Sequence, residues 1–155
     1  MIRMVKKIIY FVQQKIYYGY DASDDEDIED CRIVGYFSSK EKALQAKQVC
    51  IDNNIPDEQI EIKEFIVELN NNQKSIYVVG HEFAIKVDDS YTDYTYTFEP
   101  LSNRNKCKTL IDNLKKEDKY RFSEDRCYDA FPPDGFVITK YELDIVWYPV
   151  YMKLK

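Results

Sequence analysis

The sequence predicts an α+β fold made of two tandem β-β-α-β units, with antiparallel sheet covered by helices on one face. The composition is the first observation, because 14 Tyr, 8 Phe and only 4 Gly among 155 residues favour strands. The second is a repeated motif, since Ile9-Tyr10-Phe11-Val12 recurs as Ile76-Tyr77-Val78-Val79. The third is a change of apolar period after each motif, from two to about 3.6, which indicates strands followed by a helix. The repeat predicts a pseudo-twofold relation between the units.

Each motif begins a long apolar-rich run that is expected to form the first strand of its unit. An acidic turn ends each run, starting at Asp21 in the first unit and at Asp88-Asp89 in the second. A second strand rich in aromatic and β-branched residues follows each turn, so both units are expected to open with a β-hairpin. The four strands are expected at residues 7–18, 31–37, 74–87 and 91–98.

A helix is expected after each hairpin, over residues 39–53 and 102–117. The first begins at Ser38-Ser39-Lys40-Glu41, which has the form of a capping box. In that motif a serine and the glutamate three residues later satisfy free backbone N–H groups at the helix start. The second helix is expected to be capped by Ser102. Apolar residues then recur on one face of each helix, which indicates packing against the sheet.

The last strand of each unit is predicted by alternating apolar and polar residues, over 60–69 and 136–144. The joint between the units, residues 70–73, reads Asn-Asn-Asn-Gln and is too short for a flexible linker. The predicted domains are therefore residues 1–70 and 71–155, packed together as one compact body.

The C-terminal tail continues the apolar pattern as Ile145-Val146-Trp147-Tyr148, followed by Pro149. Proline cannot donate a hydrogen bond to a sheet ladder, so it is confined to edge strands, strand ends and bulges. The tail is therefore predicted to be an edge strand, a bent strand or two short pieces, attached to the second unit.

A family resemblance rests on these structural motifs. Residues 35–43, Gly-Tyr-Phe-Ser-Ser-Lys-Glu-Lys-Ala, and the later Phe65-Ile66-Val67 resemble a small bacterial and phage domain of unknown function. The second unit is similar over residues 133–144, but Glu99-Pro100-Leu101-Ser102 replaces the motif that precedes the first helix. The resemblance implies the strand–strand–helix–strand fold. It implies no activity, because none is assigned to the family.

The charge excludes some partner classes. The chain has 22 Lys and Arg against 28 Asp and Glu, a net charge of -6, whereas phosphate binding needs a basic surplus. Nucleic acid and an anionic membrane surface are therefore not expected as partners. The acidic excess lies mainly in residues 1–70, with 9 basic and 14 acidic side chains, against 13 and 14 in residues 71–155. No stretch approaches the ~20 apolar residues of a membrane span, so a cytoplasmic protein is expected.

Catalytic and metal-binding motifs are not found. His81 is the only histidine, and it is expected to be a solvent-facing or hydrogen-bonded strand residue rather than a base or ligand. The 4 Cys have no zinc-site spacing and are expected to be free thiols. A calcium loop starting at Asp21 would need glycine and glutamate where Glu26 and Arg32 stand. We therefore expect a protein that is not an enzyme and that uses no metal or cofactor.

The candidate binding surface combines tyrosines and acids at the two hairpin turns. Residues 21–30 contain seven acids and no base, and three tyrosines precede them. Tyrosine supplies contact area at low entropic cost, and clustered acids steer a basic surface into contact. An exposed hairpin tip with no binding role is the simpler alternative for the acidic run. The candidate residues are Tyr17, Tyr18, Tyr20, Asp21, Asp24, Asp25, Glu26, Asp27, Glu29, Asp30, Asp88, Asp89, Tyr91 and Tyr94.

The favoured hypothesis is an acidic binding protein that engages a basic protein partner, as immunity proteins and phage inhibitors do. The analogy rests on charge and size alone. A second hypothesis is a receptor that holds a small molecule or peptide in a groove between the repeats. A third is an enzyme that uses paired carboxylates, which would need two acids in one cleft with separated pKa values. A purely structural role is the fourth.

Overall fold

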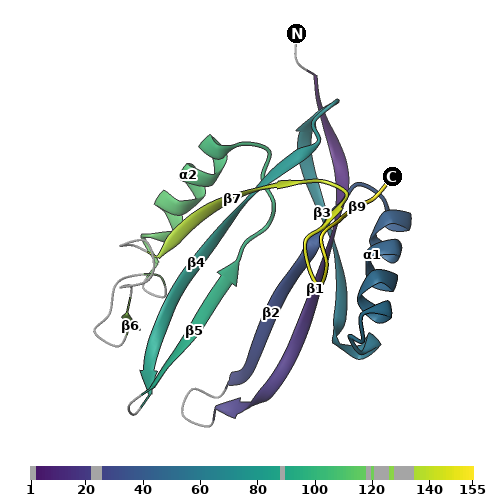
Figure 1. The fold of residues 1–155 in the computed structure, drawn as a ribbon. Helices are drawn as coiled ribbons and strands as arrows, with labels where there is room; N and C mark the ends of the chain where they lie inside the picture. Colours follow the sequence, from purple (N-terminus) through teal and green to yellow (C-terminus); the bar gives the residue numbers. More distant parts are fainter. Residues whose placement is uncertain (1–2, 22–25, 88–89, 118–119, 121–125, 128–134) are drawn as a thin grey trace. The chain divides into compact units, whose positions relative to one another are not determined.

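The computed structural model describes residues 3–21, 26–87, 90–117, 120, 126–127 and 135–155 (Figure 1). It has two α-helices and antiparallel sheets, which confirms the predicted α+β class. The chain divides into two compact units, and each is described separately below. Unit 1 comprises Met1–Lys74 and Glu142–Lys155, and unit 2 comprises Ser75–Tyr141.

Unit 1 contains a three-stranded antiparallel sheet in the order β2-β1-β3, with one helix. The central strand β1 pairs with β2 in a long hairpin, and two register shifts, at Val12/Gln13 and Tyr17/Gly19, interrupt that pairing. The elements are β1 (Met4–Asp21), β2 (Glu26–Phe37), α1 (Lys40–Asp52), the short 3-10 helix η1 (Asp57–Gln59) and β3 (Ile60–Asn70).

The core of unit 1 lies between α1 and the sheet. Helix α1 presents small residues to the core, so its backbone can approach the strands closely. Burial raises the pKa of the Cys50 thiol to about 11, as expected for a structural cysteine in apolar surroundings. The buried side chains of this core are Val12, Val34, Phe37, Ala43, Ala46, Cys50, Ile55 and Val146.

The start of α1 differs from the predicted capping box. The N-cap is Ser39, whose hydroxyl accepts a hydrogen bond from the Lys42 N–H at 3.2 Å. The hydroxyl of Ser38 instead donates to the carboxylate of Asp144, at 2.9 and 2.8 Å to its two oxygens. A cap one residue later places Lys42, not Glu41, at the third helical position, so the reciprocal serine–glutamate exchange does not form.

The C-terminal segment belongs to unit 1, which differs from the predicted assignment to the second unit. Its strands β8 (Ile145–Val146) and β9 (Met152–Lys153) pair antiparallel. The N–H of Trp147 donates to the Val34 oxygen at 2.8 Å, and the N–H of Asp144 donates to the Tyr36 oxygen at 2.9 Å. The segment therefore continues beside β2 and covers its outer edge.

Unit 2 also contains an antiparallel sheet and one helix. Strand β4 pairs with β5, with the short β6 and with β7, and the helix packs its apolar stripe against the strands. Its core contains Val79, Cys107, Leu114 and Phe136. The elements are β4 (Ser75–Val87), β5 (Ser90–Thr97), α2 (Arg104–Leu114), β6 (Arg126–Cys127) and β7 (Phe136–Glu142).

Helix α2 is shorter than predicted at both ends. Its N-cap is Asn103, whose side chain accepts from the Lys106 N–H at 2.9 Å, while Ser102 lies buried one residue earlier. The predicted cap, Ser102, was therefore wrong by one residue, since Asn caps a helix as well as Ser does. After Leu114 the Glu117 N–H bonds back to the Leu114 oxygen, three residues away, as in a turn rather than an α-helix.

The two units share an order of elements, strand–strand–helix–strand, apart from β6. In unit 1 the first strand, β1, pairs with β2 and β3, and in unit 2 the first strand, β4, pairs with β5 and β7. An origin by duplication and a pseudo-twofold relation stay predictions.

Candidate protein-binding surface

The end of the β1–β2 hairpin collects most of the predicted binding residues. We call residues 17–30 the acidic arm. The backbone register places Tyr17 opposite Glu29, Tyr20 opposite Asp27, and Asp21 opposite Glu26. Tyr18 and Gly19 lie on the same strand, and Asp30 pairs with Ile16. The predicted residues Asp24 and Asp25 lie outside the described residues.

The acidic arm has more strand than the sequence predicted. The first strand was expected to end at residue 18 and the second to begin at residue 31, but the pairing continues to Asp21 and Glu26. Tyrosine favours strands strongly enough to extend them, and the register shift between Tyr17 and Gly19 accommodates the glycine. Glu26, Asp27, Glu29 and Asp30 are therefore carried on a strand rather than in a loop.

A polar network holds the base of this hairpin. Lys15 Nζ lies 3.2 Å from Glu61 Oε2, and Lys63 Nζ lies 3.5 Å from Glu61 Oε1. The Gln13 side-chain amide also donates to Glu61, at 3.4 Å. Partial burial would raise the pKa of Glu61, but the hydrogen bonds and charges of Lys15 and Lys63 together lower it. Glu61 is therefore an ionised anchor that ties β1 to β3 below the arm.

The second predicted cluster lies on the β4–β5 hairpin of unit 2. Tyr91 pairs with Lys86 and Tyr94 pairs with Phe83 across the two strands. Asp88 and Asp89 lie outside the described residues. A lysine in the backbone register beside Tyr91 makes this hairpin less acidic than the arm.

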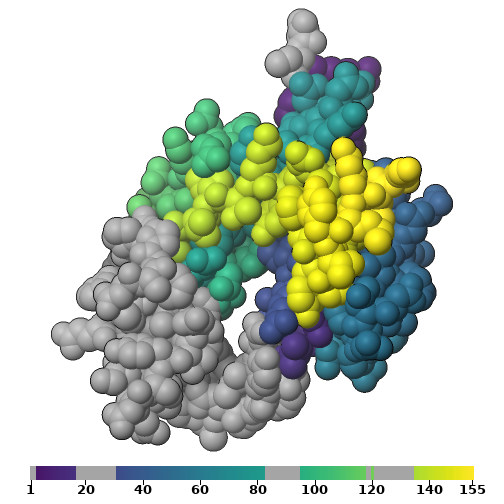
Figure 2. Space-filling view, viewed as in Figure 1, coloured from purple at the N-terminus to yellow at the C-terminus, as the bar shows by residue number. Residues whose placement is uncertain are grey.

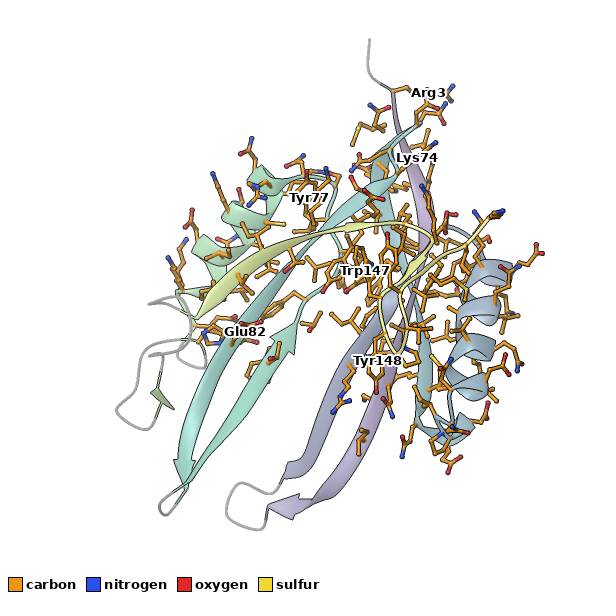
Figure 3. All side chains as sticks on the ribbon, in the orientation of Figure 1. Arg3, Lys74, Tyr77, Glu82, Trp147 and Tyr148 are labelled. Atoms are coloured by element: carbon orange, nitrogen blue, oxygen red, sulfur yellow. The ribbon has the colours of Figure 1, made fainter. Side chains whose placement is uncertain are left out.

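An exposed apolar surface on the C-terminal segment was not predicted. Trp147 is 41% exposed and Tyr151 is 65% exposed, and their rings meet edge to face with centroids 5.4 Å apart. Val150 and Met152 beside them are 40% and 42% exposed. We call these four residues the aromatic patch. The segment reaches the molecular surface in Figure 2, and Trp147 is labelled in Figure 3.

Sequence reasoning missed this patch because a short apolar run indicates burial, and only the proline indicated otherwise. Half of the run is indeed buried, since Ile145 is 1% and Val146 0% exposed. The remainder turns outward after Trp147. The available signal was Pro149, which ends a strand next to aromatic residues. It predicts a break in strand pairing, but it does not predict which side chains are exposed.

Arg32 lies on β2 next to the acidic arm and contacts Tyr148, the residue that follows Trp147 of the aromatic patch. Its Nη1 donates to the Tyr148 hydroxyl at 3.1 Å, and its guanidinium carbon lies 5.4 Å from the centroid of the same ring. Arg32 stands on β2 two residues beyond Asp30, the last acid of the arm. The patch is thus attached to the strand that carries the acids.

The turn between β7 and β8 fixes the segment to α1. Asp144 has a positive φ of 66°, which asparagine and aspartate tolerate better than most residues. Its carboxylate accepts from the Ser38 N–H at 2.8 Å and lies 3.1 Å from Lys42 Nζ. A Cβ at Gly35 would clash with the Ile145 carbonyl oxygen, so glycine is required for this close approach.

The single histidine is a core residue of unit 2. His81 lies on β4 as predicted and is fully buried, so of the two predicted alternatives, a solvent-facing or a hydrogen-bonded strand residue, the solvent-facing one was wrong. Its ring lies 4.4 Å from the Phe136 centroid and 5.4 Å from that of Tyr120. Among the described residues, no group of three or more His, Cys, Asp or Glu could hold a metal ion. Neither described helix is long and apolar enough to cross a membrane.

Comparison with known proteins returned no match, whether against family models, curated proteins or solved structures. The resemblance of residues 35–43 to a domain of unknown function therefore stays a prediction.

Proposed function

We propose that the protein is a non-enzymatic binding protein whose acidic arm engages a basic protein partner. The observation that supports this is the β1–β2 register, which extends into the acid-rich sequence as far as Asp21 and Glu26 and pairs Tyr20 with Asp27. Seven acids follow one another within ten residues, and neither lysine nor arginine occurs between Lys15 and Arg32.

Like charges that face each other across two strands destabilise a hairpin, typically by a few tenths to 1 kcal/mol per pair. A sequence selected for stability alone would place lysine near glutamate here, as it does in the ion pair between Lys15 and Glu61 lower in the same sheet. The cost of concentrating acids in the arm is offset if the arm binds a cationic surface. This argument favours a binding role over a hairpin tip with no partner.

The acidic arm is expected to raise the rate at which the protein associates with a basic partner. A surface of one sign attracts an oppositely charged partner before contact, and the association rate can rise by 10- to 1,000-fold at low ionic strength. The partner class is therefore a protein with a basic surface, as in nuclease–immunity-protein and inhibitor–enzyme pairs. Unit 2 contributes through its β4–β5 hairpin only if Tyr91 and Tyr94 reach the same partner.

The experiment is affinity capture from native lysate at low and high salt, with mass-spectrometric identification. The test variant reverses three charges of the arm, Asp24→Lys, Asp25→Lys and Asp27→Lys. The control variant reverses three exposed acids elsewhere in unit 1, Glu58→Lys, Glu64→Lys and Glu68→Lys, so the net charge changes equally. We expect a basic protein that is recovered by the wild type and the control, is lost with the arm variant, and is released by salt.

Equal recovery by the arm variant and the control would contradict the proposal, because net charge would then explain the binding. The receptor hypothesis stays a prediction, and thermal stabilisation by a metabolite library would test it.

A further inference from the structure

We propose that the C-terminal segment, residues 143–155, is a releasable strap that covers a strand-binding site on the outer edge of β2. The strap detaches as one piece while the rest of unit 1 stays folded, and the uncovered edge accepts the same segment of a second copy of the chain. Neither the acidic arm nor the proposed function enters into this inference, so the two proposals can fail separately.

The segment is a small hairpin that is folded on itself. Strand β8 pairs antiparallel with β9, with Val146 opposite Met152. The Leu154 N–H donates to the Asp144 oxygen at 2.9 Å and closes the hairpin at its base. Elements joined by their own hydrogen bonds open as cooperative units, so the segment is expected to leave β2 as one piece rather than residue by residue.

The attachment of this hairpin to β2 is narrow. The Asp144 N–H donates to the Tyr36 oxygen at 2.9 Å, and the Trp147 N–H donates to the Val34 oxygen at 2.8 Å. Among the described residues buried in the unit 1 core, Val146 is the one that the segment supplies. Strand β1, in contrast, pairs with β3 along the full length of β3. A region with few buried contacts opens at a lower free energy than the sheet that it covers.

The outward side of the segment adds little to this attachment. The four side chains of the aromatic patch are 40–65% exposed. Apolar area that stays in contact with water gives no hydrophobic stabilisation. The firmest contacts are therefore those of the buried Ile145 and Val146 side chains and of the Asp144 carboxylate with the Ser38 N–H.

The edge beneath the segment is shaped for a second strand. A Cβ at Gly35 would clash with the Ile145 carbonyl oxygen, so glycine on β2 allows the backbone of the segment to come close. Release of the segment would remove the hydrogen bonds to the Val34 and Tyr36 oxygens and uncover the apolar core beside them. An open strand edge of this kind is a template for pairing with another chain.

The segment itself indicates which chain fits this edge. A second copy can supply the same residues with the same contacts, so exchange between copies replaces each contact with an identical one. The segment of the same chain is favoured at low protein concentration, because the hydrogen bond from the Leu143 N–H to the Lys74 oxygen, at 2.8 Å, keeps it close to the edge. Exchange therefore requires the strap to open first.

Native-state hydrogen exchange of the full chain tests the release. The amides of Trp147 and Leu154 report on the segment, and the Cys50 amide in α1 reports on the rest of unit 1. A detached two-stranded hairpin is marginally stable in water, so both segment amides become open to exchange together. We expect them to share one opening constant at low urea concentrations and to be at least about tenfold less protected than the Cys50 amide.

A matched pair of valine substitutions isolates the buried contact of the strap. Val146→Ala removes two methyl groups that are fully buried, whereas Val150→Ala removes the same groups from a side chain that is 40% exposed. We expect Val146→Ala to raise the opening constant of the Trp147 amide at least about tenfold, and Val150→Ala to raise it less than about threefold.

A labelled synthetic peptide with the sequence of residues 143–155 tests the strand-binding site, because it represents the segment of a second copy. Its binding to the full chain is measured by fluorescence anisotropy of the label. The site is accessible only in the open fraction of the protein, so the apparent affinity rises with that fraction. We expect the Val146→Ala chain to bind the peptide at least about tenfold more tightly than the wild type does. A control peptide that carries Ile145→Ser and Val146→Ser should bind at least about tenfold more weakly.

The outcomes separate the strap from the strand-binding site. Equal protection of the Trp147 and Cys50 amides would overturn the strap, because the segment would then open only with the core. Different opening constants for Trp147 and Leu154 would overturn release as one piece, because a fraying terminus gives that pattern. If the segment opens but the two peptides bind equally, or neither binds to the Val146→Ala chain, the strand-binding site is overturned. All of these results leave the capture test of the acidic arm unaffected.

Discussion

The two units have the same order of elements but fill their cores in different ways. In unit 1, α1 presents Ala43, Ala46 and Cys50 to the sheet, and the C-terminal segment adds Val146 to the same core. In unit 2, α2 presents Cys107 and the larger Leu114 to the sheet, where Phe136 of β7 belongs to the same core. A helix with small core residues leaves volume for another segment, whereas a helix with larger ones fills it.

In unit 2, a cluster of aromatic rings around Tyr120 completes the core, as the C-terminal segment does in unit 1. Tyr120 meets the rings of His81, Tyr96 and Phe98 edge on, at 5.4, 5.9 and 5.5 Å between centroids. It also meets the tilted Phe136 ring at 6.2 Å. Unit 1 is instead completed by residues that follow unit 2 in the chain. Unit 1 is therefore discontinuous in sequence, and its core depends on the C-terminal segment.

The position of Trp147 makes this comparison measurable. Tryptophan fluorescence during unfolding reports on unit 1, while far-ultraviolet circular dichroism reports on both units. Each variant below should move one signal more than the other.

The largest effect is expected for Phe136→Ala in unit 2. The ring is 6% exposed and packs at 4.4 Å from the His81 ring, so its removal leaves a cavity and costs about 3–5 kcal/mol. The circular dichroism transition in urea should shift or split, while the Trp147 transition changes less. A larger shift of the Trp147 transition would contradict the division of the core into two.

A smaller effect is expected for Gly35→Ala in unit 1. The added methyl would meet the Ile145 carbonyl and the Phe37 ring, and such overpacking costs about 1–3 kcal/mol. The Trp147 unfolding midpoint should fall. Gly80→Ala in unit 2 is the matched control, because its methyl would meet only a Val137 methyl at 3.2 Å and a carbonyl oxygen at 3.7 Å. Equal shifts in both variants would show that the C-terminal segment does not pack closely on β2.

Asp144→Ala tests the attachment of the segment to α1. The change removes the acceptor for Ser38 and the ion partner of Lys42 and places alanine at a φ of 66°, so a loss of about 1–3 kcal/mol is expected. Asp144→Asn keeps an acceptor oxygen and tolerates this φ, so it should lose less. If the two variants unfold at the same urea concentration, neither the hydrogen bonds nor the backbone conformation contributes measurably.

The smallest effect is the pH dependence of Glu61. Because its pKa is lowered in the folded protein, Glu61 contributes stability above its unfolded pKa, and this is lost as pH falls through the folded pKa. The Trp147 urea midpoint should therefore fall as the pH drops below about 4.3, the ordinary pKa of a glutamate, and it should fall less in Glu61→Gln. An identical pH dependence in the variant would show that Lys15 and Lys63 do not stabilise the carboxylate.

Local patterns predicted the helices and the hairpins, because periodicity and capping residues act over a few positions. Helix α1 was expected at 39–53 and spans Lys40–Asp52. The C-terminal segment was predicted to attach to the second unit, but it pairs with β2, which is distant in sequence. A long-range contact such as the Trp147–Val34 hydrogen bond produces no periodic pattern in the sequence. Local sequence patterns were therefore enough to predict the fold class. They could not predict that the C-terminal segment packs on unit 1.

The candidate site was predictable to a similar extent. The acids from Asp21 to Asp30 were recognisable from composition, but their pairing on two strands depends on register, which tyrosines and a bulge determine. The aromatic patch could not be predicted, because the same apolar run contains buried Val146 and exposed Trp147. Only tertiary packing determines which of these side chains is buried and which is exposed.

The association rate of the captured partner tests the central claim most directly. It should be measured at low and high salt for the wild type, for the arm variant with Asp24, Asp25 and Asp27 changed to Lys, and for the control with Glu58, Glu64 and Glu68 changed to Lys. We expect the arm variant to associate at least about tenfold more slowly than the control at low salt, with the difference shrinking at high salt. Equal rates for the two variants at low salt would contradict the account.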